Sequence, residues 1–144
     1  MITMPSAIDV ARYILDNFGE MTTMKLQKLV YYCQAYCLAW YDRPMFDETI
    51  RAWTHGPVVY ELFNEHRGQY KISAEDLNAD DDHPLGEEDQ DVIDSVCEAF
   101  EGLTGWELRN RTHEEDPWLD NFHEDAPWHN EEIPQEEMRQ YYAE

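Results

Sequence analysis

The chain has 144 residues, of which 42% are hydrophobic and 13% aromatic, and it carries a net charge of −22. This apolar content exceeds that of an intrinsically disordered chain, and the length suits one packed domain over residues 1–144. No run approaches the ~18 apolar residues that a membrane span needs, which favours a cytoplasmic protein. Three cysteines, an odd number, do not indicate a disulfide framework.

The negative charge is concentrated in the second half of the chain. Residues 1–72 hold seven Lys or Arg and eight Asp or Glu, whereas residues 73–144 hold three and 24. Direct binding to nucleic acid is disfavoured, because phosphates require neutralising Lys and Arg side chains. The acidic half either meets a basic partner or serves solubility alone, and the composition leaves both interpretations open.

Two helices are predicted in the first third of the chain. Over residues 6–18 the apolar side chains have helical spacing, and Ser6 with Asp9 has the pattern of a capping box. Residues 23–41 are apolar on nearly every face, which predicts a central helix that other elements cover on all sides. This helix ends before Pro44, because proline cannot continue the hydrogen-bond ladder.

The middle of the chain is less regular. Residues 46–54 are mixed in polarity and are expected to be irregular or strand-like. Pro57 after Gly56 suits the first position of a further helix, which ends at Gly68. Residues 73–91 hold many acidic and few apolar side chains, which predicts a mobile acidic loop.

The last third predicts more helices and an irregular segment. Helical spacing returns over residues 92–103, and residues 104–111 begin with a second capping-box pattern. Residues 112–134 hold three prolines, which predicts an irregular strap anchored on the core by Trp118 and Trp128. A last helix follows. The expected fold is mainly α: a compact helical bundle around the central apolar helix.

Patterns for catalysis or metal binding are weak. Cys33 and Cys37 lie four apart on a predicted helix, but no Cys or His pair with ligand spacing accompanies them, so they are interpreted as buried small apolar residues. No nucleophile elbow, phosphate loop or dinucleotide motif is present. A hydrolase or metal site would have to use histidines without a known catalytic spacing, namely His55, His113, His123 and His129, with Glu114 nearby. We therefore expect no enzyme activity, no metal and no cofactor.

Lys25 and Lys28 lie three residues apart among the apolar residues of the second helix. They are interpreted as solvent-facing side chains or as partners of carboxylates from the acidic half. Binding of a ligand is the alternative.

Three segments together resemble one family. They are MKLQKLVYY at residues 24–32, FDE followed by AWTHGPVV within residues 46–59, and THEEDPW at residues 112–118. In this order and spacing they are similar to the Panacea domain. This domain, also called the SocA-like or phage-associated GepA-type domain, is found in antitoxins of type II toxin–antitoxin systems.

The resemblance implies a mainly helical domain that neutralises a cognate protein toxin by binding it. It makes the following motif residues candidates for partner binding: Lys25, Gln27, Lys28, Trp53, His55, Gly56, Pro57, Thr112, His113, Pro117 and Trp118. Structural roles in a turn, a cap or the core are the favoured alternative for these residues. A toxin that acts on RNA or nucleotides needs a basic site, which acidic residues can cover.

Two other functions remain open. One type of relative is an adaptor that delivers its toxin to a protease. A different class of function is a phage-encoded acidic decoy that occupies a nucleic-acid-binding host protein. The identity of the toxin is not predicted, because relatives pair with toxins of unrelated activities.

Overall fold

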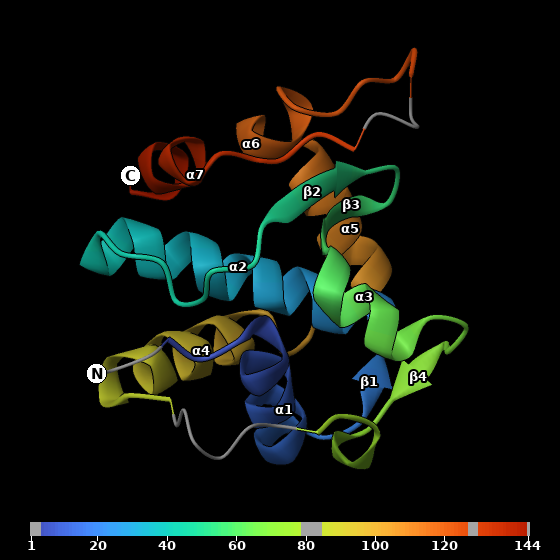
Figure 1. Ribbon diagram of the computed structural model, residues 1–144, viewed down its shortest axis with the longest axis vertical. Helices are drawn as coiled ribbons and strands as arrows, with labels where there is room; N and C mark the ends of the chain where they lie inside the picture. The colour runs from blue at the N-terminus through green and yellow to red at the C-terminus, as the bar shows by residue number, and fades with distance from the viewer. Residues whose placement is uncertain (1–3, 79–84, 127–129, 144) are drawn as a thin grey trace.

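Helix α2 (Thr23–Tyr41) is the element around which the others pack in the computed structural model, which describes residues 4–78, 85–126 and 130–143. In Figure 1 it crosses the middle of the molecule, with α1 and α4 on one side and the β2–β3 hairpin, α5 and α7 on the other. Its side chains are buried on all faces, and Tyr31 and Tyr32 are fully enclosed. The predicted central helix over residues 23–41 is confirmed.

The described residues form seven α-helices and four short strands, so the mainly α fold class is confirmed. The remaining helices are α1 (Ala7–Phe18), α3 (Tyr60–His66), α4 (Glu87–Ala99), α5 (Gly105–His113), α6 (Asp116–Leu119) and α7 (Gln135–Tyr142). The strands are β1 (Met21–Thr22), β2 (Ile50–Trp53), β3 (Gly56–Val59) and β4 (Lys71–Ile72), and a 3₁₀ turn covers Ala74–Asp76.

Both predicted capping boxes are present. Ser6 Oγ accepts a hydrogen bond from Asp9 N at 3.0 Å, and Thr104 Oγ1 accepts one from Glu107 N at 3.1 Å. In each box a second bond runs from the backbone N–H of the capping residue to the acidic side chain, so the pair of bonds satisfies two backbone donors. These local patterns fix the starts of α1 and α5.

The β2–β3 hairpin corrects the prediction for Pro57. This residue lies in β3 opposite Ala52 and does not begin a helix, because Gly56–Val59 pairs antiparallel with β2. The register places Thr54 and His55 in a two-residue turn. Helix α3 therefore begins three residues later than predicted, at Tyr60.

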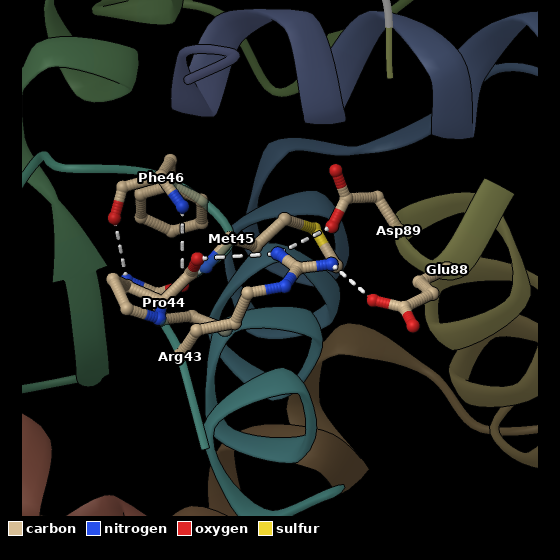
Figure 2. Close-up of polar contacts among 7 residues, drawn as sticks. Arg43, Pro44, Met45, Phe46, Glu88 and Asp89 are labelled. Carbon is tan, nitrogen blue, oxygen red and sulfur yellow. Dashed lines mark hydrogen bonds and ion pairs between the residues drawn. The ribbon is translucent and has the colours of Figure 1, made fainter. Parts of the chain in front are cut away.

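The acidic segment also differs from the prediction. Helix α4 begins at Glu87, inside the expected loop, and ends at Ala99 rather than near residue 103. Figure 2 shows the reason at its first turn: Arg43, just after α2, lies between Glu88 and Asp89. The Arg43 nitrogens are 3.1 Å from Glu88 Oε1 and 2.9 Å from Asp89 Oδ1.

Acidic side chains at a helix N-terminus are also favoured by the helix dipole. These carboxylates are therefore part of a folded element. The other acidic residues of the expected loop, Asp80, Asp81 and Asp82, lie outside the described residues, as does the loop's Pro84.

The chain after α2 is attached to that helix by Gln34. This buried side chain accepts a hydrogen bond from Met45 N at 2.6 Å and donates one to Phe46 O at 2.8 Å. Figure 2 shows Met45 and Phe46 beside the Arg43 contacts. The amide thus compensates backbone groups that burial would otherwise leave unpaired.

The C-terminal strap returns along β2. Ile133 N donates to Ile50 O at 2.7 Å, and Ala52 N donates to Glu131 O at 2.9 Å. The strap contains the short helix α6 and leads into α7 after Pro134. The second expected anchor, Trp128, lies outside the described residues.

Candidate functional site

The three motif segments meet at one place, where strand β3 of the hairpin lies against α2 and α5 (Figure 1). We call Lys28, Gly56, Thr112, His113 and Trp118 the hairpin junction. A Cβ on Gly56 would be 2.5 Å from Lys28 Cε and 3.0 Å from Thr112 Oγ1. Gly56 also has a φ of 109°, a conformation that favours glycine. Glycine is therefore the residue that lets the hairpin backbone lie this close to the Lys28 side chain.

Lys28 is the main correction within the junction. Its side chain is 2% exposed, so it is not solvent-facing. In the described part of the chain, no carboxylate forms an ion pair with it. Burial, together with the positive charge of Arg109, lowers the pKa of Lys28 to about 7. Near neutral pH this ammonium is therefore poised to lose its proton.

His113 and Trp118 form an aromatic stack that continues to Phe122. The His113 and Trp118 rings are 3.8 Å apart and nearly parallel, and Trp118 and Phe122 are 4.6 Å apart. Trp118 Nε1 donates a hydrogen bond to Trp53 O at 2.8 Å, which joins α6 to β2. This bond and the 7% exposure of Trp118 agree with the structural role predicted for it.

The electrostatic surroundings of His113 are positive. Burial lowers its pKa to about 4, and Arg109, Lys28 and His55 contribute further by repelling a charged ring. A hydrogen bond with the Thr54 backbone acts in the opposite direction and is the weaker effect. The imidazole is therefore neutral at pH 7.

Arg109 is a member of this region that sequence reasoning missed, because it belongs to none of the three motifs. Its guanidinium lies over the Trp106 ring at 4.4 Å, and its Nη1 donates to Asn110 Oδ1 at 2.9 Å. Its Nε is buried and has no hydrogen-bond partner. His55, predicted from the motif, is exposed on the hairpin turn with its ring 6.4 Å from that of Trp106.

Gln27 and Pro57 are interior residues. The Gln27 side chain accepts from Val59 N at 2.9 Å and donates to Val59 O at 3.2 Å. Its Nε2 also lies 3.0 Å from His66 Nε2. Because the Gln27 amide is used to hold β3 on α2, it has a structural explanation that needs no partner.

Three further motif residues lie outside the junction. Lys25 Nζ donates to Glu101 O at 3.0 Å, and Trp53 Nε1 donates to Asn130 Oδ1 at 2.7 Å. Pro117 is buried in the first turn of α6, where its missing N–H is not needed. Trp53 pairs with Gly56 in the hairpin register and so lies next to the Lys28–Gly56 contact.

A groove of about 660 Å³ lies between α2, α6 and α7. The aromatic rings of Tyr36 and Tyr141 line it, together with the carboxylates of Asp116, Asp120 and Glu137. We call these five residues the acidic groove. Because its residues come from three elements far apart in the sequence, no local pattern predicts it.

A buried hydrogen-bond network forms one wall of the acidic groove. Glu115 accepts hydrogen bonds from the Tyr32 hydroxyl at 2.6 Å and the Tyr142 hydroxyl at 2.8 Å. Tyr142 Oη also lies 2.9 Å from Tyr31 Oη. Burial raises the pKa of Glu115, while the two tyrosine hydrogen bonds and Arg111 oppose that shift. This network attaches α7 to α2.

The exposed end of α2 extends the aromatic surface beside the groove. Trp40 is 52% exposed, and its ring is 5.1 Å from that of Tyr36. Arg139 of α7 lies 3.6 Å from Asp42 at the end of α2. Large exposed aromatic side chains are typical of protein interaction surfaces, which are enriched in Tyr and Trp.

The described residues contain no group of three or more His, Cys, Asp or Glu side chains arranged to hold a metal ion. His129, one of the histidines considered for such a site, is not among them. Cys33 and Cys37 are buried free thiols, as predicted. Across the part of the chain that is described, no helix is both long and apolar enough to cross a membrane.

The fold is mainly helical, and the three motif segments meet at the hairpin junction. The family model described as "Antitoxin SocA-like, Panacea domain" matches residues 26–119. The chain therefore belongs to the SocA-like Panacea antitoxin family. The match covers the Lys28–Gly56 contact and α6, and it ends before α7. No curated protein and no solved structure matches the chain.

Proposed function

We propose that the chain is the antitoxin of a type II toxin–antitoxin system and neutralises a cognate protein toxin by binding it directly. The observation that supports this contact surface is the acidic groove, which is lined by both carboxylates and aromatic rings. Asp116 and Asp120 are exposed, whereas Glu137 is half-buried and accepts a hydrogen bond from Asn121 Nδ2 at 2.6 Å. Family membership supports the antitoxin role. The groove supplies the chemistry that recognition of a basic toxin needs.

The groove suits a Lys or Arg side chain of the toxin. Asp116 and Asp120 are exposed, so they remain available to a partner, while the groove's Arg111 lies 3.6 Å from Glu115. The faces of Tyr36 and Tyr141 offer cation–π contacts to the same side chain. A toxin cation docked here would be held by charge and by aromatic packing together.

The hairpin junction has a different role in this proposal. Lys28, Gly56 and Thr112 are buried, so they maintain the packing of β3 on α2 and α5 rather than contact the toxin. His55 and Trp53 are more accessible and contribute to binding only if the toxin also covers the hairpin turn. Changes in the buried residues would weaken rescue through stability.

The test begins by expressing each adjacent reading frame alone, and it uses the product that proves toxic; if neither product is toxic and neither binds the chain, the proposal is contradicted. A groove variant combines Asp116→Asn, Asp120→Asn and Glu137→Gln. A control variant removes the same charge from exposed positions of α4 through Glu87→Gln, Asp91→Asn and Glu98→Gln. We expect the groove variant to lose rescue and at least tenfold in affinity by calorimetry, and the control to retain both. Equal losses in the two variants would show that net charge, not the groove, governs binding.

The same experiment separates direct neutralisation from the two alternatives. If the chain is a protease adaptor, toxin abundance falls on co-expression and recovers when the protease is removed. If the chain is a decoy for a nucleic-acid-binding host protein, that host protein copurifies without any toxin. Stable toxin levels in a stoichiometric complex support direct neutralisation.

We also infer that neutralisation proceeds without catalysis by this chain. Purified protein, with or without divalent metal, is expected to leave RNA, nucleotides and ester substrates unchanged. His55→Ala and His113→Ala then alter rescue only through stability or binding. A metal-dependent activity that either substitution abolishes would contradict this inference.

A further inference from the structure

Four basic side chains from three elements converge in a chain whose net charge is −22. Lys28 comes from α2, His55 from the β2–β3 turn, and Arg109 and His113 from α5. Lys28, Arg109 and His55 all act electrostatically on His113. Within the described ranges, none of the four forms an ion pair with a carboxylate. Arg109 and, below about pH 7, Lys28 bring positive charge to this site in an acidic protein.

Polar atoms at this site are buried without partners. Arg109 Nε and His113 Nε2 are enclosed and form no hydrogen bond. The Lys28 ammonium, on a side chain 2% exposed, has no hydrogen bond to any described residue. Buried polar groups in folded proteins are almost always paired, because an unpaired one has lost its hydrogen bonds to water without replacing them. Arg109 Nε and His113 Nε2 are two such atoms in one region, which indicates that a ligand completes the site.

The cavity beside these atoms measures about 560 Å³. Arg109 and His113 line one part of it, and Trp118 and Phe122 form an aromatic wall. Glu124 is the carboxylate among its lining residues, and it is exposed. This volume falls within the range of about 300–1,000 Å³ that is usual for small-molecule sites. It exceeds what a single inorganic ion would occupy.

We propose that this cavity binds a small organic molecule carrying an oxyanion, either a phosphate or a carboxylate. The Arg109 guanidinium attracts the oxyanion, and the His113 ring does so once it is protonated, because both residues line the cavity. Lys28 lies behind them, against Gly56 and Thr112, and adds positive potential. The rings of Trp118 and Phe122 pack against the organic part of the ligand. The proposal is independent of toxin binding, because the acidic groove is lined by different residues.

Proton uptake should accompany binding. The charged or titratable groups that face His113 are Arg109 on its own helix, Lys28 from α2, His55 from the hairpin turn and Glu124 on the cavity wall. A bound anion offsets the repulsion from the first three, and so it raises the pKa of His113. Affinity is therefore expected to increase as the pH falls from 8 to 6.

The test is calorimetric titration of the full chain with inorganic phosphate, phenyl phosphate and benzoate. Phenyl phosphate and benzoate share a ring and differ in the oxyanion, so their order of affinity identifies the anion. Both should bind at least tenfold more tightly than inorganic phosphate, because only they reach the aromatic wall. Arg109→Gln should lose at least tenfold in affinity for the preferred probe.

Arg67→Gln is a matched control. Arg67 also lies over an aromatic ring, that of Phe63 at 5.2 Å, and also donates to a nearby Asn side chain, but it does not line the cavity. This variant should bind as the original chain does. Loss of affinity in both variants alike would overturn the assignment.

Nuclear magnetic resonance of the unmodified chain keeps the proposal testable if Arg109→Gln does not fold. The ring signals of His113, assigned through His113→Gln, should shift on addition of the probe and titrate at a higher pH, while those of His123 stay in place. Absence of binding by all three probes at 10 mM, roughly the weak limit for a specific site, would overturn the proposal. Unchanged His113 signals in the presence of bound probe would do the same.

Discussion

Gly56 and Lys28 are in direct contact although 28 positions separate them in the sequence: a Cβ on Gly56 would lie 2.5 Å from Lys28 Cε. The glycine is on the hairpin and the lysine on the central helix, so this contact fixes how closely the two elements approach. It also explains how a lysine is enclosed. The hairpin backbone covers the Lys28 side chain at Gly56, which has no side chain of its own.

Gly56→Ala is expected to destabilise the fold. The added methyl group overlaps Lys28, and the φ of 109° is strained for alanine, so we expect a loss of about 2–4 kcal/mol in the free energy of unfolding. Gly68→Ala is the control, because Gly68 has a φ of 85° but no atom within 4 Å of an added Cβ. It should cost only the backbone strain, about 1 kcal/mol. Urea denaturation measures both variants. If Gly56→Ala and Gly68→Ala lose the same free energy of unfolding, the contact between Gly56 and Lys28 is not tight.

Lys28→Met is expected to change how stability depends on pH. The pKa of Lys28 is about 7 in the fold against an ordinary value of 10.5, so between these limits the unfolded chain holds a proton that the folded chain has released. The stability of the original chain therefore rises with pH relative to Lys28→Met, by at most about 1.4 kcal/mol per pH unit. Below pH 7 the difference between the two chains is constant, because Lys28 is protonated in both the folded and the unfolded state.

Chemical denaturation at pH 6, 7, 8 and 9 measures this difference. Lys71→Met, which removes an exposed lysine from β4, is the control and should follow the pH dependence of the original chain. If the free energy of unfolding changes with pH in the same way for the original chain and for Lys28→Met, then Lys28 keeps an ordinary pKa in the fold.

The elements that the sequence predicts well are those set by local chemistry. The capping boxes at Ser6 and Thr104 involve residues three apart, and the central helix is apolar on all faces over residues 23–41. Pro57 shows the limit of such rules. Proline after glycine suits a helix start, but pairing with β2 decides the structure there, and that pairing depends on residues outside the local window.

The candidate site is harder to predict for the same reason. The burial of Lys28 depends on Gly56, and the acidic groove combines Tyr36 with Asp116 and Tyr141. Spacing along the chain gives no signal for contacts between distant segments. The resemblance to a family identified the segments that meet at the junction, but it did not indicate Arg109, whose importance comes only from its position in space.

Tyr142→Phe is expected to loosen α7. The substitution removes the hydroxyl that donates to buried Glu115 and lies 2.9 Å from the Tyr31 hydroxyl. Because hydrogen bonds to charged groups contribute about 1.5–3 kcal/mol, we expect a loss of that size in the free energy of unfolding. Tyr141→Phe changes the neighbouring, partly exposed tyrosine and should stay within about 0.5 kcal/mol of the original chain. Amide exchange in α7 that is equally fast in both variants would contradict the assignment.

Asp89→Asn is expected to cost stability where Asp91→Asn does not. Asp89 is buried in the first turn of α4 and lies 2.9 Å from the Arg43 guanidinium, whereas Asp91 is exposed. Because Arg43 itself is partly exposed, the expected loss is about 1–2 kcal/mol, less than for a fully buried pair. Thermal unfolding compares the two variants. If they unfold at the same temperature, the Arg43 contact does not explain why α4 begins at Glu87.

The association of toxin and antitoxin is expected to be faster at low salt. If the carboxylates of the acidic groove attract a basic toxin over a distance, screening should reduce the association rate once the Debye length falls to about 3 Å near 1 M salt. The dissociation rate should change less, because packing against Tyr36 and Tyr141 is not screened. Stopped-flow mixing at several salt concentrations separates the two rates. The groove variant should associate slowly at every salt concentration, whereas the α4 control should keep the salt dependence of the original chain. A salt-independent association rate in the original chain would mean that the carboxylates serve solubility and that aromatic contacts alone recognise the toxin.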